Sequence, residues 1–518
     1  MFFTLTKLKA GSAFLLFVIL HSASMSWGQL TQAGRIEIPI KNEMQAHSVF
    51  SLDTSGLLLY RQFVGQSENL LELTRLDTAL QKKWNGLLPL PKGFELLHTQ
   101  SRAGMIYFLC KNATPGKFDF TIIVLNAKSG NYNIYSIKNL IAFNATEFVA
   151  INHAVFIGGY FNFRPLVLFY SFLEKRSRAL TGFLNEPGEL TQMNPHDDGN
   201  VDIVVSARNA SRKKSIWIRQ YDNSGELVKT IVVEPTSNKN LIFGRVVDTG
   251  HDNLVAVGVY GRNVQYSRGI FVADINSFGE YIIRYYNFAD LKNFFHYLKA
   301  KREKRILARI QRRRIKGKKI KFNYRMLVHE LIPIDGKLVM VGEAFYPVYS
   351  NRSSNYSGFI NNSGPYGYSP WRMGYPSNFP YYQPGMGLVL DGYQYTHAIA
   401  IGFDQHGKPL WDNSFEINGV KSYQLEQHIK VQHNQNQIDL IYLYENKIRT
   451  KTVKDGKLQE DIPLEIKTLS QPAVETLTNT SKLDYWYNRH LIVYGTQYLK
   501  SSAGDEQVVF FVNKLVVN

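Results

Sequence analysis

Short runs of β-branched and aromatic residues recur at a regular distance along the chain, and each run ends on a small or polar residue. The eight runs are 58–61, 107–110, 155–158, 203–206, 255–258, 339–342, 440–443 and 492–495. Their last residues lie 49, 48, 48, 52, 84, 101 and 52 positions apart. A repeat near 50 residues that holds several short strands is typical of a β-propeller and not of a helical solenoid.

Within one repeat, alternating apolar and polar residues predict four strands. In the fifth repeat these strands are expected at 241–247, 254–260, 269–274 and 280–287. Asp, Asn and Gly lie between the strands, because these residues adopt positive φ or cap a turn with a side chain. Each repeat is therefore predicted to form one four-stranded blade.

Two insertions explain the two long spacings. They cover residues 288–321 and 346–386, and without them about 52 residues after position 28 remain for each of eight repeats. The chain from 29 to 518 is therefore predicted to be a single all-β domain, an eight-bladed β-propeller; a seven-bladed ring is the alternative.

The two ends of the chain are predicted to share one blade. The eighth repeat ends after its third strand, at 507–517, and lacks a fourth. The segment Gly34–Ile40 alternates correctly and lies outside the first repeat. If it supplies the missing strand, the ring closes and no free sheet edge remains.

Each unit thus reads apolar run, Gly, spacer, apolar run, Asp-x-x-x-Gly and a further apolar run, with outer turns such as Asp222–Gly225 and Asp404–Gly407. In this order the chain resembles a loosely defined group of exported bacterial β-propeller repeat proteins. The resemblance covers nearly the whole chain after residue 28. It implies the propeller fold and export, and it names no ligand.

The first 28 residues have the pattern of a secretory signal peptide. Lys7 and Lys9 supply the charged end, residues 13–20 an apolar run, and Ser26–Gly28 a small-x-small cleavage site. No later stretch approaches the roughly 18 to 20 apolar residues of a transmembrane helix. The protein is therefore expected to be exported, to the periplasm, the cell surface or the medium, without a transmembrane segment.

Motifs that carry chemistry are few. The sequence lacks a nucleophile elbow, a phosphate loop, a dinucleotide fingerprint and a zinc-type Cys/His spacing. The segment Asn194–Asp202 gathers oxygen ligands that would suit Ca²⁺, but its position between two strands favours a turn. Cys110 is the single cysteine, and its apolar surroundings predict a buried, unreactive thiol. We predict no catalytic residue, metal or cofactor, and lean against an enzyme, although carboxylates from several blades could meet at the ring axis.

Positive charge is concentrated in the first insertion. The chain has 60 Lys and Arg against 42 Asp and Glu, and 13 of the basic residues lie between Lys299 and Lys321, with Glu303 as the one acid. Apolar residues at helical spacing predict a helix from Ala289 to Ile315 whose early part docks on the ring. The side chains expected to contact a partner are Arg302, Arg305, Arg309, Arg312, Arg313 and Arg314.

Three interpretations of this basic helix remain open. It could be a solvated helix over one face of the propeller, with its arginines paired to acids elsewhere in the chain. It could bind an acidic or envelope protein, an anionic membrane surface or a polyanionic glycan. Nucleic acid would match the charge but does not suit an exported protein, so it is the least favoured partner.

The second insertion is rich in aromatic and small residues. It holds eight Tyr, six Pro, five Gly and seven Ser, without periodicity, which predicts a long loop. Tyr and Trp with Ser and Gly are also the chemistry of antibody binding loops. The loop is therefore either packed on itself or a recognition loop for a protein or for sugar rings. Its expected contact residues are Tyr366, Tyr368, Trp371, Tyr375, Tyr381 and Tyr382.

Both insertions flank the sixth repeat, so they should lie on neighbouring parts of the ring. The sequence therefore predicts an exported, non-catalytic scaffold that binds another protein through the sixth blade, for example as a subunit of an outer-membrane or periplasmic assembly. The rival prediction is a carbohydrate-binding or carbohydrate-cleaving propeller. The rival would place converging carboxylates and exposed aromatic residues at the ring axis.

Overall fold

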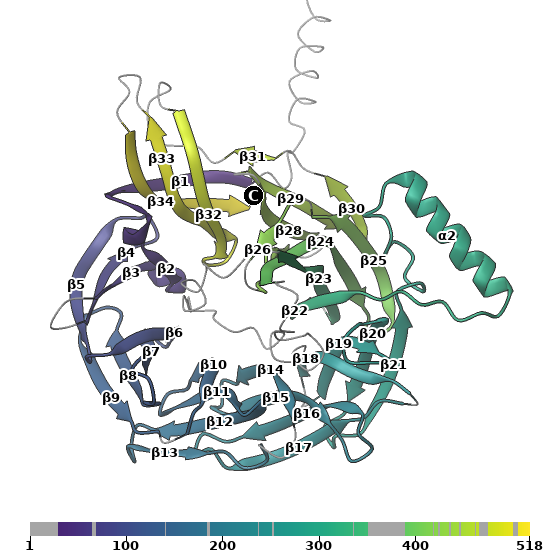
Figure 1. Ribbon diagram of the computed structural model, residues 1–518, viewed down its shortest axis with the longest axis horizontal. Helices are drawn as coiled ribbons and strands as arrows, with labels where there is room; N and C mark the ends of the chain where they lie inside the picture. The colour runs from purple at the N-terminus through teal and green to yellow at the C-terminus, as the bar shows by residue number, and fades with distance from the viewer. Residues whose placement is uncertain are drawn as a thin grey trace, which may run out of the picture.

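The computed structural model describes residues 30–64, 69–139, 141–183, 187–236, 238–250, 253–334, 336–350, 389–417, 419–422, 425–434, 437–444, 447–460, 463–465, 475–500 and 506–517. Over these residues the strands form eight sheets that surround a central axis (Figure 1). The predicted eight-bladed β-propeller is confirmed, and the seven-bladed alternative is wrong. The predicted signal peptide and most of the second insertion lie outside the described residues.

Seven blades are built from consecutive strands. Blades one to three contain β2 Ser48–Ser51, β3 Leu57–Val64, β4 Asn69–Leu76 and β5 Lys82–Leu90; β6 Phe94–Arg102, β7 Met105–Asn112, β8 Phe120–Asn126 and β9 Tyr132–Ile137; β10 Asn144–Ala150, β11 Ala154–Phe161, β12 Arg164–Ser171 and β13 Arg176–Ala179. Blades four and five contain β14 Gly188–Pro195, β15 Val201–Arg208, β16 Lys214–Tyr221 and β17 Leu227–Val233; β18 Asn240–Gly250, β19 Asn253–Gly261, β20 Gly269–Ile275 and β21 Tyr281–Asn287. The four strands expected in the fifth repeat are thus present.

Blades six and seven each carry one extra short strand. Blade six contains β22 Arg325–Ile334, β23 Lys337–Ser350, β24 Val389–Phe403 and β25 Pro409–Glu416, with β26 Lys421–Ser422 paired to β24. Blade seven contains β27 Lys430–Asn434, β28 Gln437–Tyr444, β29 Lys447–Lys454 and β30 Lys457–Glu460, with β31 Leu464–Glu465 paired to β29. Two short 3-10 turns, η1 Glu43–Gln45 and η2 Asp53–Ser55, flank β2.

The eighth blade joins the two ends of the chain, as predicted. It orders β32 Glu475–Tyr485, β33 His490–Lys500 and β34 Glu506–Val517 with β1 Leu30–Ile40 on the far side of β34. Ile36 pairs with Val512 and Ile40 with Val508 in antiparallel register. The strand begins earlier than the predicted Gly34, at Leu30, and a β-bulge after Gln32 keeps its side chains in register.

The small residue that ends many of the apolar runs has a packing cause. In blade five the inner strand β18 bulges between Leu241 and Phe243. The bulge brings the Phe243 carbonyl so close to Gly258 that a Cβ at position 258 would collide with its oxygen. In blade three, a side chain on Gly158 would collide with the Met193 sulfur of the next blade. Glycine at these markers therefore lets inner strands and neighbouring blades approach closely.

The hydrophobic core consists of clusters that bridge neighbouring blades. One cluster joins blades one and two and includes Leu58, Leu73, Phe108 and Ile123. Cys110 is fully buried in the same cluster, and burial raises the pKa of its thiol to about 12. The prediction of a buried cysteine is confirmed, and a thiol with this pKa carries almost no reactive thiolate near neutral pH.

The helix of the first insertion is shorter than predicted. Helix α2 spans Ala300–Ile315, whereas residues 288–299 form turns. The cause lies in β25, where the Asp412 carboxylate accepts hydrogen bonds from the backbone N–H groups of Lys292 (3.0 Å) and Asn293 (2.6 Å). The backbone N–H of Tyr297 donates to the Ser414 hydroxyl at 3.2 Å. These donors are taken by side chains of the ring and do not form helical hydrogen bonds.

The second insertion begins as a strand pair and not as a loop. β23 and β24 stay paired beyond the ring as far as Ser350 opposite Val389, so the predicted loop start at Tyr346 is wrong. Tyr346 pairs with Gln394 and Tyr349 with Leu390. Aromatic residues and Val348 favour a strand, and cross-strand pairing outweighs the local Pro347. We call this extension, residues 345–350 and 389–395, the arm.

Candidate binding face

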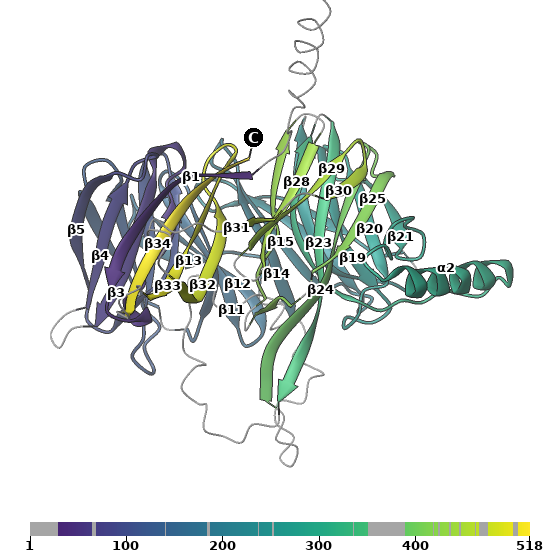
Figure 2. The same ribbon diagram turned by 90° about the horizontal axis from the view of Figure 1, so that it is seen from above.

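Both insertions leave the ring on the same face. In each blade, the connection between the second and third strands and the connection to the next blade leave the sheet at the same end of the strands. The first insertion connects blades five and six, and the second connects β23 to β24. Figure 2 shows the arm projecting from that face of the ring, with α2 at the rim on the same side.

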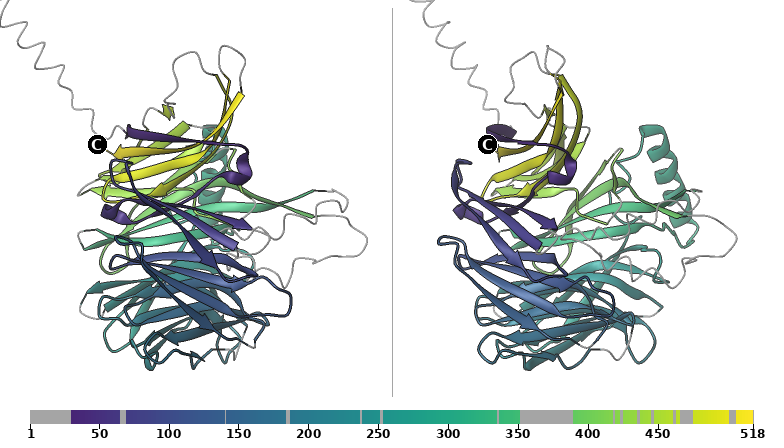
Figure 3. Two further views of the ribbon diagram at one scale, coloured as in Figure 1. Left: turned by 90° about the vertical axis from the view of Figure 1, so that its left-hand side faces the viewer. Right: turned by 60° about the vertical axis from the view of Figure 1, so that its left-hand side comes forward.

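Helix α2 is held to the ring by a narrow strip of contacts. Ile310 is its buried residue, 5 % exposed, and Ile306 packs beside it against the core of blades five to seven. The Arg314 guanidinium donates to the Ala289 carbonyl at 2.7 Å and pairs with Asp290 at 3.1 Å. Figure 3 shows the helix standing outside the ring with its long side free of other elements. Most of its surface therefore faces solvent.

The basic side chains of α2 are mostly exposed and lack acidic partners. Arg302, Arg305 and Arg309 are exposed, and none of them forms an ion pair with a described residue. Arg312 donates to a carbonyl of its own helix at 3.3 Å, and Arg313 donates to the Lys319 carbonyl at 3.0 Å. Among these six arginines, Arg314 is the one that forms an ion pair with a described residue, and its partner Asp290 belongs to the insertion itself.

The one acid of the helix does not reduce this charge on its outer side. Glu303 is half-buried and lies 3.2 Å from the Nε2 atom of His296, a residue of the turns that precede the helix. Its carboxylate therefore faces the base of the insertion. The outer surface of α2 presents positive charge without an adjacent negative group of its own helix.

The arm presents aromatic side chains on the same face of the ring, closer to the ring axis than α2 (Figure 2). Tyr346 is 50 % exposed and Tyr349 is 40 % exposed, whereas Phe345, Tyr393 and Tyr395 are buried at the base of the arm. The ring of Phe345 packs against that of Tyr393 with centroids 5.7 Å apart. The six aromatic residues predicted to contact a partner, Tyr366, Tyr368, Trp371, Tyr375, Tyr381 and Tyr382, lie outside the described residues.

A buried histidine joins the base of the first insertion to β24. The His397 ring stacks on Tyr297 with centroids 3.7 Å apart, and its Nδ1 atom lies 2.9 Å from the Thr396 hydroxyl. Phe294 packs edge-on against the same ring at 5.6 Å. Burial lowers the pKa of His397 to about 3, so the imidazole is neutral at physiological pH. This stack fixes the start of the insertion relative to the arm.

A buried carboxylate joins blades six and seven below the arm. Glu343 on β23 accepts hydrogen bonds from the backbone N–H groups of His428 (3.1 Å) and Ile429 (2.7 Å), and lies 3.1 Å from His329 Nε2. Burial raises the pKa of Glu343, but its electrostatic interactions with His329 and His428 and its hydrogen bonds with His329 and the Ile429 N–H outweigh that effect, and the pKa lies below its ordinary value. The ionised carboxylate thus anchors the connection between the blades.

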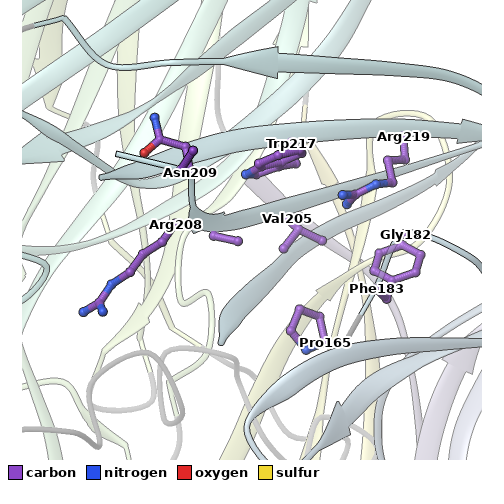
Figure 4. A pocket seen from close by; sticks show the side chains of 10 residues that line it. Pro165, Gly182, Phe183, Val205, Arg208, Asn209, Trp217 and Arg219 are labelled. Carbon is purple, nitrogen blue, oxygen red and sulfur yellow. The ribbon is translucent and has the colours of Figure 1, made fainter. Parts of the chain in front are cut away.

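A separate pocket lies between blades three and four. It encloses about 240 Å³ and is lined by Pro165, Gly182, Phe183, Val205, Ala207, Arg208, Asn209, Ala210, Trp217 and Arg219. Figure 4 shows Arg219 beside Trp217, with Arg208 across the pocket. The Arg219 guanidinium lies 5.1 Å from the Trp217 ring centroid and 5.2 Å from that of Phe183. The lining contains two cations and no carboxylate.

The other sites considered from the sequence hold no recognisable reactive centre. His196 pairs with Asp202 at 2.9 Å at a turn between β14 and β15, which places the segment Asn194–Asp202 where a turn was expected. Over the part of the chain that the structure describes, no three His, Cys, Asp or Glu side chains cluster as metal ligands would. None of the helices in that part is both long and apolar enough to span a bilayer.

The pocket residues were not singled out from the sequence. Trp217 and Arg219 are two positions apart on β16 and therefore share one face of the sheet, which is a visible pattern. Phe183 comes from the connection between blades three and four, and only the fold brings it close to Trp217 and Arg219. Tyr346 and Tyr349 lay inside the predicted loop, but the strand that exposes them was not recognised.

No known family model and no curated protein sequence matches the chain. Among solved structures, the polysaccharide lyase Uly1 aligns over 94% of this chain and 100% of its own, at 9% identity and a TM-score of 0.37. Prolyl oligopeptidase B from Galerina marginata aligns over 95% of this chain and 58% of its own, at 8% identity and a TM-score of 0.38. At these scores the similarities carry no argument about function.

Proposed function

We propose that the protein is an exported, non-catalytic scaffold of the bacterial cell envelope that binds an acidic partner protein through α2 and the arm of blade six. It would act in the periplasm or at the cell surface, in the manner of the exported propeller repeat proteins that the sequence resembles. The observation that carries the proposal is the exposed, unpaired charge of α2.

Unpaired charge on a projecting helix favours a contact with another molecule. A basic surface attracts acidic partners over several ångströms, and acidic groups in contact with it restore the neutralisation that the ring does not provide. Arg302, Arg305 and Arg309 are free to form such pairs. Tyr346 and Tyr349 add large, rigid surfaces of the kind that dominate protein interfaces.

A protein partner is favoured over a membrane surface by the way in which α2 is oriented. A helix that lies in a bilayer interface needs a free apolar stripe. The apolar stripe of α2, Ile306 and Ile310, already packs against the ring. Leu307 and Ile315 are exposed, but they are separated by Gln311 and do not form a second continuous stripe.

The proposal is tested by neutralising the exposed charge while keeping the insertion intact. Removing residues 288–321 would expose a buried aromatic core, so substitution is the cleaner experiment. In the variant, glutamine replaces Arg302, Arg305, Arg309 and Arg312. A matched control carries the same number of glutamine replacements on blades two and three, at the exposed positions Lys117, Lys128, Lys138 and Arg176.

Each protein is crosslinked in its native envelope, and its partners are compared. We expect the α2 variant to lose at least about 90% of the crosslinked partner, with the control unchanged, because each charge-assisted contact is worth about 1 kcal/mol or more. An unchanged set of partners in the α2 variant would contradict the proposal. Loss of the partner in both variants would show that overall charge, and not the helix, is responsible.

A further inference from the structure

The pocket between blades three and four has its own chemistry, separate from α2 and the arm. Its lining is positively charged through Arg208 and Arg219, and aromatic through Trp217 and Phe183. Pockets that hold drug-sized ligands enclose about 300 to 1,000 Å³. The volume of about 240 Å³ limits the ligand to about one ring with its substituents.

Arg219 is held in place before any ligand binds. Its guanidinium lies over the rings of both Trp217 and Phe183, and a Cβ on Gly182 would press against its Nε atom at 2.8 Å. Phe183 is itself fixed, because its ring stacks on Tyr221 at 5.9 Å. A cation fixed by aromatic rings loses little rotamer freedom when it pairs with an anion.

This guanidinium also lacks an anionic partner. Arg219 forms no hydrogen bond or ion pair with any described residue, and burial lowers its pKa. A half-buried cation without a counter-charge gains more from an anion than a fully hydrated one does. Arg208 lies across the pocket and supplies a second positive charge (Figure 4).

From this arrangement we propose that the pocket binds one ring of an acidic saccharide, a sugar that carries a carboxylate or a sulfate. The anionic group pairs with Arg219, and Arg208 adds positive charge at the opposite edge of the pocket (Figure 4). The apolar C–H face of the sugar ring packs on Trp217. The pocket is partly open to solvent, so the bound ring can belong to a longer chain.

The test measures binding by isothermal titration calorimetry with four probes. They are a trimer of galacturonic acid, its methyl-esterified neutral form, a sulfated galactose trimer and inorganic sulfate alone. We expect one or both acidic trimers to bind at least about tenfold more tightly than the neutral trimer and than sulfate. Comparison of the two acidic trimers then identifies the anionic group. Equal binding of the neutral trimer, or of sulfate alone, would overturn the proposal.

Variants locate the binding in the pocket. Arg219→Met and Trp217→Ala are each expected to lower the affinity for the acidic trimer by at least about tenfold. Trp217→Phe keeps an aromatic face and should lower this affinity by much less. The matched control is Arg262→Met. Arg262 is an exposed arginine between β19 and β20 of blade five, the connection that corresponds to the one between β15 and β16 in blade four. Thermal unfolding of each variant confirms that it is folded. Unchanged affinity in Arg219→Met would overturn the proposal.

The α2 variant separates this inference from the proposed function. If the pocket is the site, the trimer binds that variant as tightly as it binds the unmodified protein. If binding is lost in the α2 variant and kept in Arg219→Met, the saccharide binds the helix and the pocket proposal is wrong. Neither result depends on whether the crosslinked envelope partner is lost.

Discussion

The two halves of the first insertion have opposite surroundings, although they are continuous in sequence. In residues 288–298, the side chains of Phe288, Phe294 and Phe295 are buried in the core. The backbone N–H groups of Lys292 and Asn293 donate hydrogen bonds to the Asp412 carboxylate. Residues 300–315 form a helix that buries little more than Ile310 and exposes its arginines. The first half therefore supplies stability, and the second half is free to carry a binding function.

The largest expected effect comes from removing a buried aromatic ring from residues 288–298, the base of the first insertion. Phe294 is 1 % exposed and packs against Phe288 with ring centroids 4.5 Å apart. Phe294→Ala should lower the free energy of unfolding by about 3 to 5 kcal/mol, because a large cavity replaces the ring. Urea denaturation measures this loss. A change below about 1 kcal/mol would mean that the base is not part of the cooperative core.

A smaller effect is expected at the side chain that shapes the turns. Asp412→Asn leaves one acceptor oxygen for the two backbone N–H groups of Lys292 and Asn293. The amide NH2 group that replaces the other oxygen is itself a donor and cannot accept the second hydrogen bond. The unfolding free energy should fall by about 2 kcal/mol, as for a buried hydrogen bond to a charged group. Asp404→Asn, in the exposed turn between β24 and β25, is the control and should change stability by less. Equal losses of unfolding free energy in the two variants would show that Asp412 does not stabilise the turns of the insertion more than an ordinary turn residue does.

The base should also make stability depend on pH. The pKa of His397 is lowered to about 3, so between pH 3 and 6.5 the unfolded chain binds more protons at this residue than the folded one. Its contribution therefore falls as the pH drops, by about 2 kcal/mol from pH 7 to pH 5. Other buried histidines titrate too, so the measured quantity is the difference between the protein and His397→Phe. Parallel pH profiles would contradict the assignment.

The smallest effect on stability is expected on the helix. Arg305→Gln and Arg309→Gln together should change the unfolding free energy by no more than about 0.5 kcal/mol, because both side chains are exposed and unpaired. Partner binding should nevertheless fall. A loss of stability as large as that of Asp412→Asn would show that these arginines are structural, and the contrast between the two halves would disappear.

Most of the ring could be predicted from local patterns, whereas the insertions could not. The repeat of about 50 residues and the alternation in Gly34–Ile40 are read directly from the chain, and both describe the closed ring. The extent of the helix depends on Asp412, which is 120 positions from Lys292. The arm depends on pairing between β23 and β24, which are far apart in sequence. The pocket depends on contacts between two blades. Such long-range contacts leave no periodic signal.

The central claim is that the outer side of α2 touches an acidic protein in the envelope. Site-specific photocrosslinking tests it most directly, with the photoreactive residue placed at position 305 on the helix or at position 128 on blade two as the reference. We expect a protein adduct from position 305, joined through an acidic stretch and suppressed by high salt, with none from position 128. Absence of an adduct at 305, or the same adducts from both positions, would contradict it.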